Sequence, residues 1–185
     1  MKKVMIIMIM LGFFTSLQAK YNPYSFRSLV HSMKHLSYTQ RQTIKLIKES
    51  ARSKQEAIEM LAQVWEESSF GVYKVLRDKR NWRKSSYGWF HATLRTTKYN
   101  LHRQGIHVSY KRIRYLLLHN IKFNIRQYRR NINYWKKIRH HNLKQALACY
   151  NGGYKGYKRR VPKLYSRRVM LKMKVIKYLI KRHLV

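Results

Sequence analysis

Apolar residues recur every three or four positions along most of the chain, which is the spacing of amphipathic helices. One helix has a clear start, because Ser53 and Glu56 match a capping box, in which each side chain satisfies a backbone N–H of the first turn. In this helix an apolar stripe faces the core, Glu67 falls at its edge, and Glu66 falls nearly opposite. The pattern predicts helices over Tyr24–His35, Tyr38–Ser50, Lys54–Glu67, Gly88–Gln104, Tyr110–His119, Phe123–Arg139, Leu143–Tyr150 and Lys163–His183.

Residues that favour turns are scarce. The chain holds seven Gly and two Pro in 185 residues, and a fold with many β-turns needs these residues for their backbone geometry. No internal repeat, linker or shift in composition divides the chain after Ala19. A chain of this length suits one domain, since domains of roughly 100–150 residues are the commonest. We therefore predict an all-α fold, with a single domain over residues 20–185.

The first nineteen residues have the layout of a secretory signal peptide. A positive start at Met1–Lys3 precedes the uninterrupted apolar run Val4–Phe14, and Thr15–Ala19 forms a small polar end. The run is shorter than the ~20 residues that a membrane span needs. An uncleaved anchor or a buried first helix is the alternative. We predict that residues 1–19 are a signal peptide and that the mature protein is periplasmic or associated with the cell wall.

The chain is strongly basic, with 42 Lys and Arg against six acids and a formal net charge of +36. Such a charge indicates a polyanionic partner: nucleic acid, an acidic cell-wall polymer or anionic lipid. Export disfavours nucleic acid and favours the wall and the envelope surface. The last predicted helix is basic and amphipathic, and it either docks on its own domain, the commoner case, or contacts a membrane surface.

The six acids leave few candidates for acid catalysis. Glu56 is assigned to the helix cap, Glu49, Glu59 and Glu66 are expected on solvent-facing positions, and Asp78 is expected in a surface ion pair. Glu67 remains, and it is the acid expected to be half-buried against apolar neighbours. Burial raises the pKa of a carboxyl group, which can then donate a proton near neutral pH. The alternative is that Glu67 only ends a helix.

Metal and cofactor chemistry has little support in the sequence. The single residue Cys149 excludes an internal disulfide framework and a cysteine-based zinc site. The nine His, which include the pair His140–His141, show no metal-ligand spacing with the acids. We predict no metal site and no cofactor.

Three short motifs follow one another along the chain: Glu-Ser-Ser-Phe at 67–70, Gly-Trp-Phe-His at 88–91 and Ala-Cys-Tyr-Asn-Gly-Gly at 148–153. In order and approximate spacing they resemble the bacterial lytic transglycosylases related to goose-type lysozyme, whose pattern is Glu-Ser-x-Phe, Gly-x-x-Gln and Ala-x-Tyr-Asn-x-Gly. The resemblance covers roughly residues 55–153. It implies a lysozyme-like helical domain, to which this chain adds a basic C-terminal helix.

The resemblance also implies roles for individual residues. Glu67 matches the catalytic glutamate, which protonates the oxygen between N-acetylmuramic acid and N-acetylglucosamine and then, as a base, activates the 6-hydroxyl of the muramic acid. The product is a 1,6-anhydro sugar. His91 stands where the family usually has Gln, and both side chains can hydrogen-bond a sugar. The residues that match substrate-binding positions are Ser68, Gly88, Phe90, His91, Tyr150 and Asn151.

The shortage of acids favours transglycosylation over hydrolysis, because attack by the sugar's own hydroxyl needs no second carboxylate to activate water. Asp78 or Glu66 would have to supply that carboxylate in a hydrolase. We therefore predict a monomeric transglycosylase acting on peptidoglycan strands, in wall remodelling or beside a secretion, conjugation or phage machine. The rival prediction is a non-enzymatic cationic protein that binds peptidoglycan or the envelope through a degenerate cleft.

Overall fold

The computed structural model describes residues 23–78 and 81–184, so the predicted signal peptide lies outside the described residues. The chain divides into two compact units, of which the first ends at His35 and the second begins at Leu36. The first unit contributes helix α2 (Phe26–Lys34), whose N-terminus is capped by the Ser25 side chain. The other helices and strands belong to the second unit.

The second unit is mostly helical, and the predicted all-α class is confirmed. The helices predicted over 38–50 and 110–119 have the same bounds in the structure. The helices are α3 (Tyr38–Ser50), α4 (Lys54–Ser68), α5 (Leu94–His102), α6 (Tyr110–His119), α7 (Ile121–Ile138), α8 (Leu143–Gly152) and α9 (Arg160–Lys181), with the short 3₁₀ helices η1 (Trp82–Lys84) and η2 (Gly156–Lys158). The strands are β1 (Val75–Leu76), β2 (Ser86–Tyr87) and β3 (Ala92–Thr93), which pair antiparallel in the order β1-β2-β3.

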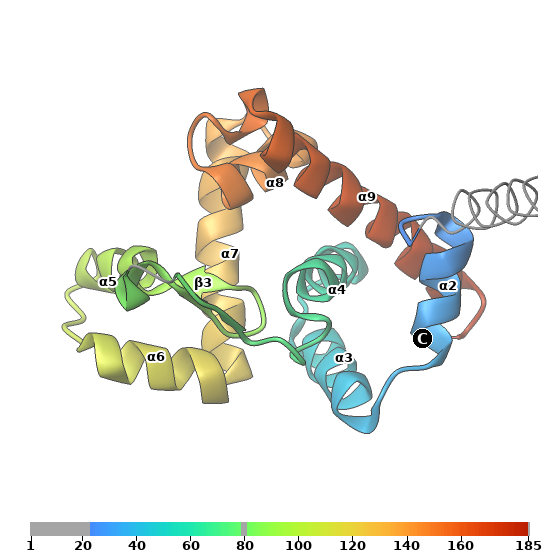
Figure 1. The fold of residues 1–185 in the computed structure, drawn as a ribbon, viewed down its shortest axis with the longest axis horizontal. Coiled ribbons are helices and arrows are strands. Elements are labelled where there is room, and N and C mark those ends of the chain that lie inside the picture. Colours follow the sequence, from blue (N-terminus) through green and yellow to red (C-terminus); the bar gives the residue numbers. More distant parts are fainter. Residues whose placement is uncertain (1–22, 79–80, 185) are drawn as a thin grey trace, which may run out of the picture. The chain divides into compact units, whose positions relative to one another are not determined.

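Helix α7 lies between two groups of elements in the second unit (Figure 1). In one group α4 packs against α3 and α9, and α8 packs against both α7 and α9. In the other group β2, α5 and α6, together with the first turn of α7, form a hydrophobic cluster of Tyr87, Leu94, Leu101, Ile113, Leu117 and Phe123. The two groups therefore meet through α7 and through the segment that connects α4 to β2.

Polar side chains cap the helices of this unit, which explains where they begin. Ser37 and Gln40 form a complete capping box at α3, with a bond in each direction. At α4 the predicted box is only half formed. Ser53 accepts from the Glu56 amide, but the Glu56 carboxylate accepts from the amide of Arg52 instead of that of Ser53.

The helix predicted from Gly88 is wrong in its first turns, because residues 86–93 form the β2–β3 hairpin and α5 begins only at Leu94. Gly88 and His91 have φ angles of +84° and +45°, which a right-handed helix excludes. A Cβ atom at Gly88 would lie 2.0 Å from Asn124 Oδ1, so the turn packs directly on α7. The short apolar run Trp89–Phe90 fits either a helix or a strand, and periodicity cannot separate them.

Helix α4 is buried on more than one face, and the predictions of solvent-facing Glu59 and Glu66 are wrong. Ala62, on the face expected to be solvated, is fully buried. Glu59 is 8% exposed and pairs with Lys136 of α7 at 2.6 Å. The Glu66 side chain is 7% exposed and pairs with two cations of α9. Basic side chains from α7 and α9 thus neutralise Glu59 and Glu66 of α4.

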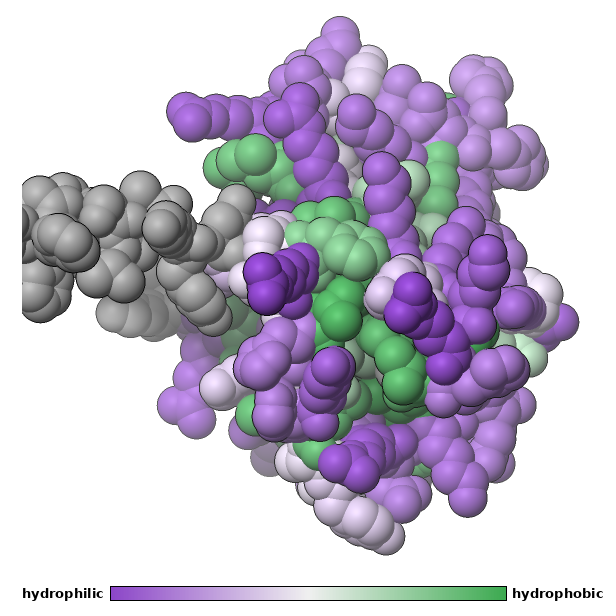
Figure 2. Space-filling view, turned by 90° about the vertical axis from the view of Figure 1, so that its right-hand side faces the viewer, coloured by the Kyte–Doolittle hydropathy of each residue, from purple (hydrophilic) through white to green (hydrophobic). Residues whose placement is uncertain are grey.

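The remaining basic residues give the molecule a polar exterior. Figure 2 shows one face on which hydrophilic residues cover most of the surface around a group of hydrophobic residues near its centre. None of the helices in residues 23–78 and 81–184 has the length and apolar content needed to cross a membrane.

Candidate active site

The carboxylate of Glu67 is placed by the way α4 ends. Ser69, Phe70 and Gly71 have φ angles of +48°, +57° and +90°, so the chain turns sharply out of the helix. The Ser68 hydroxyl lies 2.8 Å from the carbonyl of Trp89 and accepts from the Gly71 amide at 3.0 Å. The end of α4 is therefore bound directly to the β2–β3 turn, which carries His91.

Three residues that the resemblance places in contact with substrate support the site from inside the protein. Ser68 and Phe90 are fully buried, and the Phe90 ring stacks on Tyr128 with centroids 4.4 Å apart. Gly88 makes room for Asn124, since any larger residue would collide with that side chain. The hydroxyl of Ser68 and the ring of Phe90, predicted to contact substrate, are instead enclosed by protein.

Glu67 has a partner on each carboxylate oxygen. Tyr165 of α9 donates its hydroxyl proton to Oε1 at 2.6 Å, and Nδ1 of His91 lies 3.2 Å from Oε2. The side chains of Glu67 and His91 are 11% and 10% exposed, and Tyr165 is 3% exposed. Residues from α4, α9 and the hairpin thus converge on one largely dehydrated carboxyl group.

The geometry around His91 determines how many protons the pair holds. Nε2 lies 2.7 Å from the carbonyl oxygen of Tyr73, which only accepts, so Nε2 must carry a proton. Nδ1 faces Glu67 Oε2, and an attractive contact there needs one more proton between the two atoms. The pair is therefore either an imidazolium beside a carboxylate or a neutral imidazole that accepts from a carboxylic acid. In both forms it stores one proton that can be transferred.

Electrostatics and backbone strain both mark His91. Burial lowers the pKa of its imidazole, but the hydrogen bond and charge of Glu67 outweigh burial, with help from the Tyr73 carbonyl, so the pKa lies above its ordinary value. Its φ of +45° lies in the left-handed region, which is uncommon outside Gly, Asn, Asp and His. Such strain persists where the surrounding structure imposes it and is common at functional sites.

The side chains of Tyr150 and Asn151 have different surroundings, although the two residues are adjacent in sequence. The Tyr150 hydroxyl donates to the carbonyl of Phe90 at 2.8 Å. Burial raises the pKa of the Tyr150 and Tyr165 hydroxyls well above the usual value, and the charge of Glu67 adds to the effect. Both tyrosines therefore remain donors near neutral pH. Asn151 lies on the exposed side of α8.

The other five acids occupy different settings. Four of them pair with Lys or Arg: Glu49 with Lys45, Glu56 with Arg129, Glu59 with Lys136, and Glu66 with Arg168 and Lys172. Asp78 lies in an exposed loop, where its carboxylate accepts from the Asn81 amide. Glu67 instead faces the hydroxyl of Tyr165 and the imidazole of His91.

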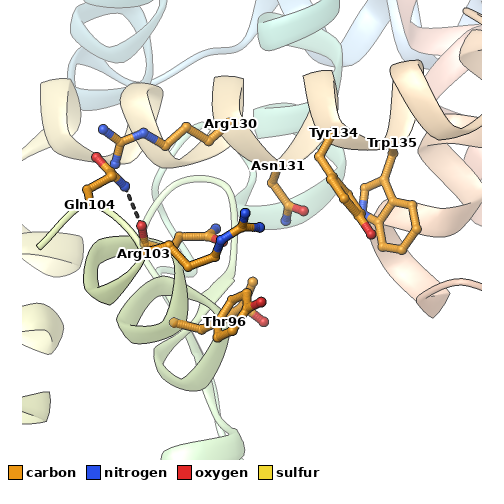
Figure 3. A pocket seen from close by; sticks show the side chains of 9 residues that line it. Thr96, Arg103, Gln104, Arg130, Asn131, Tyr134 and Trp135 are labelled. Carbon is orange, nitrogen blue, oxygen red and sulfur yellow. Dashed lines mark hydrogen bonds between the residues drawn. The ribbon is translucent and has the colours of Figure 1, made fainter.

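Two adjoining hollows lie beside the pair. A small pocket of about 80 Å³ is lined by His91, Tyr150 and polar residues of β3, α5 and α7. It shares Thr96, Asn100 and Asn131 with a groove of about 560 Å³ between α5 and α7. Figure 3 shows residues of α5 and the following turn facing residues of α7 across this groove. Glu67 is not among the residues that line either hollow, but its partner His91 lines the smaller one.

Metal binding has no support in this region. Within residues 23–78 and 81–184, no three His, Cys, Asp or Glu side chains are grouped closely enough to hold a metal ion. Cys149 is buried, and its sulfur lies 3.2 Å from Nε of Arg139.

Sequence reasoning missed two residues of the site. Tyr165 lies four residues before Val169 and thus on the buried stripe of α9, where a tyrosine hydroxyl usually needs a partner. The spacing of apolar residues in α9 could therefore have indicated that Tyr165 is buried and needs a hydrogen-bond partner. Gln127 of α7 is 3% exposed and lines the small pocket, yet its Oε1 has no hydrogen-bond partner among the described residues. No sequence signal marks Gln127.

Comparison of the chain with protein-family models, with curated proteins and with solved structures gave no match.

Proposed function

We propose that the protein is an exported lytic transglycosylase that cleaves peptidoglycan strands between N-acetylmuramic acid and N-acetylglucosamine. The observation that carries the proposal is the placement of Glu67, which is largely buried and bonded to Tyr165 and His91 instead of to a permanent cation. The resemblance of the three motifs supports it, since His91 and Tyr150 line one pocket and Glu67 contacts His91.

In the proposed reaction Glu67 is the acid and then the base. Its carboxylic acid gives a proton to the glycosidic oxygen as the bond from that oxygen to C1 of the muramic acid breaks. The 6-hydroxyl oxygen of the same sugar bonds to C1, and its proton returns to the Glu67 carboxylate. The ring closes as a 1,6-anhydro sugar, no water is consumed, and the carboxylic acid is restored. Tyr165 stabilises the carboxylate form between the two steps by donating to Oε1.

The test is mass spectrometry of soluble fragments after purified peptidoglycan is incubated with the mature chain. We expect 1,6-anhydro-muramic ends from the wild type and from Glu49→Gln, the same substitution at an exposed acid, and none from Glu67→Gln. Reducing ends in place of anhydro ends would contradict transglycosylation and direct attention to Asp78 or Glu66. Anhydro ends produced by Glu67→Gln would refute the role of Glu67.

A second candidate is a non-enzymatic cationic protein that binds peptidoglycan or the envelope surface. It is favoured by the same partners that enclose Glu67, because both carboxylate oxygens are occupied and the side chain does not line the pocket. Binding of the sacculus without any soluble product, by a protein shown to be folded, would decide for this candidate.

A further inference from the structure

The groove between α5 and α7 has features that the proposed reaction does not use. Arg103, just after α5, and Arg130 of α7 lie on its opposite walls, both exposed (Figure 3). None of the residues that line it is acidic. A guanidinium group binds a carboxylate through two parallel hydrogen bonds, so each of these arginines offers a partner for a negatively charged group.

Aromatic side chains stand beside the two arginines. Tyr99 of α5 is 61% exposed and Tyr134 of α7 is 52% exposed, and Tyr134 meets Trp135 edge to face with centroids 4.9 Å apart. Exposed rings of this kind are costly to leave in water and offer flat apolar faces to a ligand that also carries polar groups. The ring faces of sugars have this character.

The groove leads into the small pocket at His91, where a buried acceptor lacks a partner. Gln127 is 3% exposed, and its Oε1 has no hydrogen bond from any described residue. A buried polar atom without a partner costs about 1–3 kcal/mol, so a ligand that supplies a donor binds favourably there. The amide N–H of an N-acetylated sugar is such a donor, and Thr93, Thr97 and Asn131 add further polar groups for sugar hydroxyls.

We propose that the α5–α7 groove binds a carboxylate-bearing substituent of an N-acetylated glycan strand through Arg103 and Arg130, while the sugars of the strand extend to Gln127 and His91. The inference rests on the proposed function for its substrate class, but it concerns binding and not chemistry.

The carboxylate has two sources in peptidoglycan: the stem peptide, and the lactyl group that becomes free when the stem is removed. Calorimetric titration of the full chain carrying Glu67→Gln, which removes turnover, compares three ligands. They are a neutral oligomer of N-acetylglucosamine, strands without stems and strands with stems. We expect at least one acidic strand to bind about tenfold more tightly than the neutral oligomer. Tighter binding of strands with stems assigns the carboxylate to the peptide, and equal binding assigns it to the sugar.

The double variant Arg103→Gln/Arg130→Gln should lose this preference and leave binding of the neutral oligomer within about twofold. Lys111→Gln/Arg112→Gln on α6 removes the same charge outside the groove and serves as the matched control, with thermal unfolding confirming that both variants fold. The proposal would be overturned if the two double variants lost affinity for the acidic strands to the same extent. Equal affinity of the wild-type groove for neutral and acidic strands, or displacement of the acidic strand by a single-stranded oligonucleotide at equal concentration, would also overturn it.

Because the titration uses a protein without its catalytic carboxyl group, it separates the two proposals. Absence of anhydro products from the wild type together with arginine-dependent binding would refute the reaction and retain the groove. Anhydro products from the wild type, together with equal binding of neutral and acidic strands, would retain the reaction and refute the groove.

Discussion

Replacing Glu66 with Gln should destabilise the fold strongly, because this acid neutralises two cations at the contact between α4 and α9. Its Oε1 lies 2.6 Å from Nε of Arg168, and its Oε2 lies 2.8 Å from Nζ of Lys172. The side chains of Glu66 and Lys172 are each 7% exposed. A neutral amide at position 66 would leave the Lys172 ammonium group buried without its counter-charge.

The expected loss in the free energy of unfolding is about 3–5 kcal/mol, the usual cost of removing one partner from a buried ion pair. Two features favour the lower end of this range of energies. Arg168 is 34% exposed and can turn toward water, and the Lys172 ammonium group lies 5.0 Å from the centroid of the Trp65 ring, which attracts it in either protein. At about 2–4 °C per kcal/mol for a chain of this size, the melting temperature should fall by roughly 6–20 °C.

The loss should also depend on pH. Burial already lowers the pKa of Lys172, and the attraction of Glu66 works against that effect. Without Glu66 the folded state favours neutral lysine more strongly, whereas the unfolded lysine keeps a pKa of about 10.4. Folding of the variant therefore expels a proton, and its stability should rise relative to the wild type as the pH rises from 7 toward 10.

Thermal unfolding followed by circular dichroism at 222 nm measures both effects, with urea unfolding as an independent estimate. Glu49→Gln is the matched control, since that acid is 56% exposed and lies 3.9 Å from Lys45, and it should cost less than about 0.5 kcal/mol. If Glu66→Gln and Glu49→Gln melt within 3 °C of each other, a difference worth about 1 kcal/mol, then Glu66 is not the buried counter-ion described above.

Three further changes test the site and its support. The raised pKa of His91 means that its pairing stabilises the fold below about pH 6.5 and loses this effect as the pH rises through the folded-state value, so His91→Gln should flatten the melting temperature between about pH 6 and 9. Gly88→Ala should cost about 2–6 kcal/mol in urea unfolding, because it combines a φ of +84° with a Cβ only 2.0 Å from Asn124 Oδ1. Arg129→Lys should cost about 1–3 kcal/mol at pH 7, since it loses a two-bond contact with Glu56, and less in acid, because that contact lowers the pKa of Glu56.

For each of these three predictions, one outcome would contradict the reasoning. Parallel pH curves for the wild type and His91→Gln would exclude a proton shared at position 91. A Gly88→Ala protein as stable as the wild type would show that the β2–β3 turn can move away from α7. If Arg129→Lys cost as much at pH 3 as at pH 7, its effect would come from packing and not from the ion pair.

Local sequence patterns were enough to predict much of the helical structure. The bounds of α3 and α6 agree with prediction because a capping serine and the spacing of apolar residues act within a few positions of each other. The half-buried position of Glu67 at the edge of the α4 stripe follows from the same spacing, and its side chain is 11% exposed. The pattern failed at residues 88–93, where contact with Asn124 more than thirty positions away imposes a hairpin.

The sequence by itself determined the all-α class, the starts of α3, α4, α6 and α8, the shortage of acids and the residue at the edge of α4. Tertiary structure alone decided what each acid does. The helical pattern assumes one buried face, but α7 and α9 cover α4 from further sides and bring Lys136, Arg168 and Lys172 to its acids. The partners of Glu67 are likewise distant in sequence, with Tyr165 arriving from 98 positions along the chain. A carboxyl group becomes a counter-ion or a proton donor according to which side chains surround it, and only the folded chain brings those side chains together.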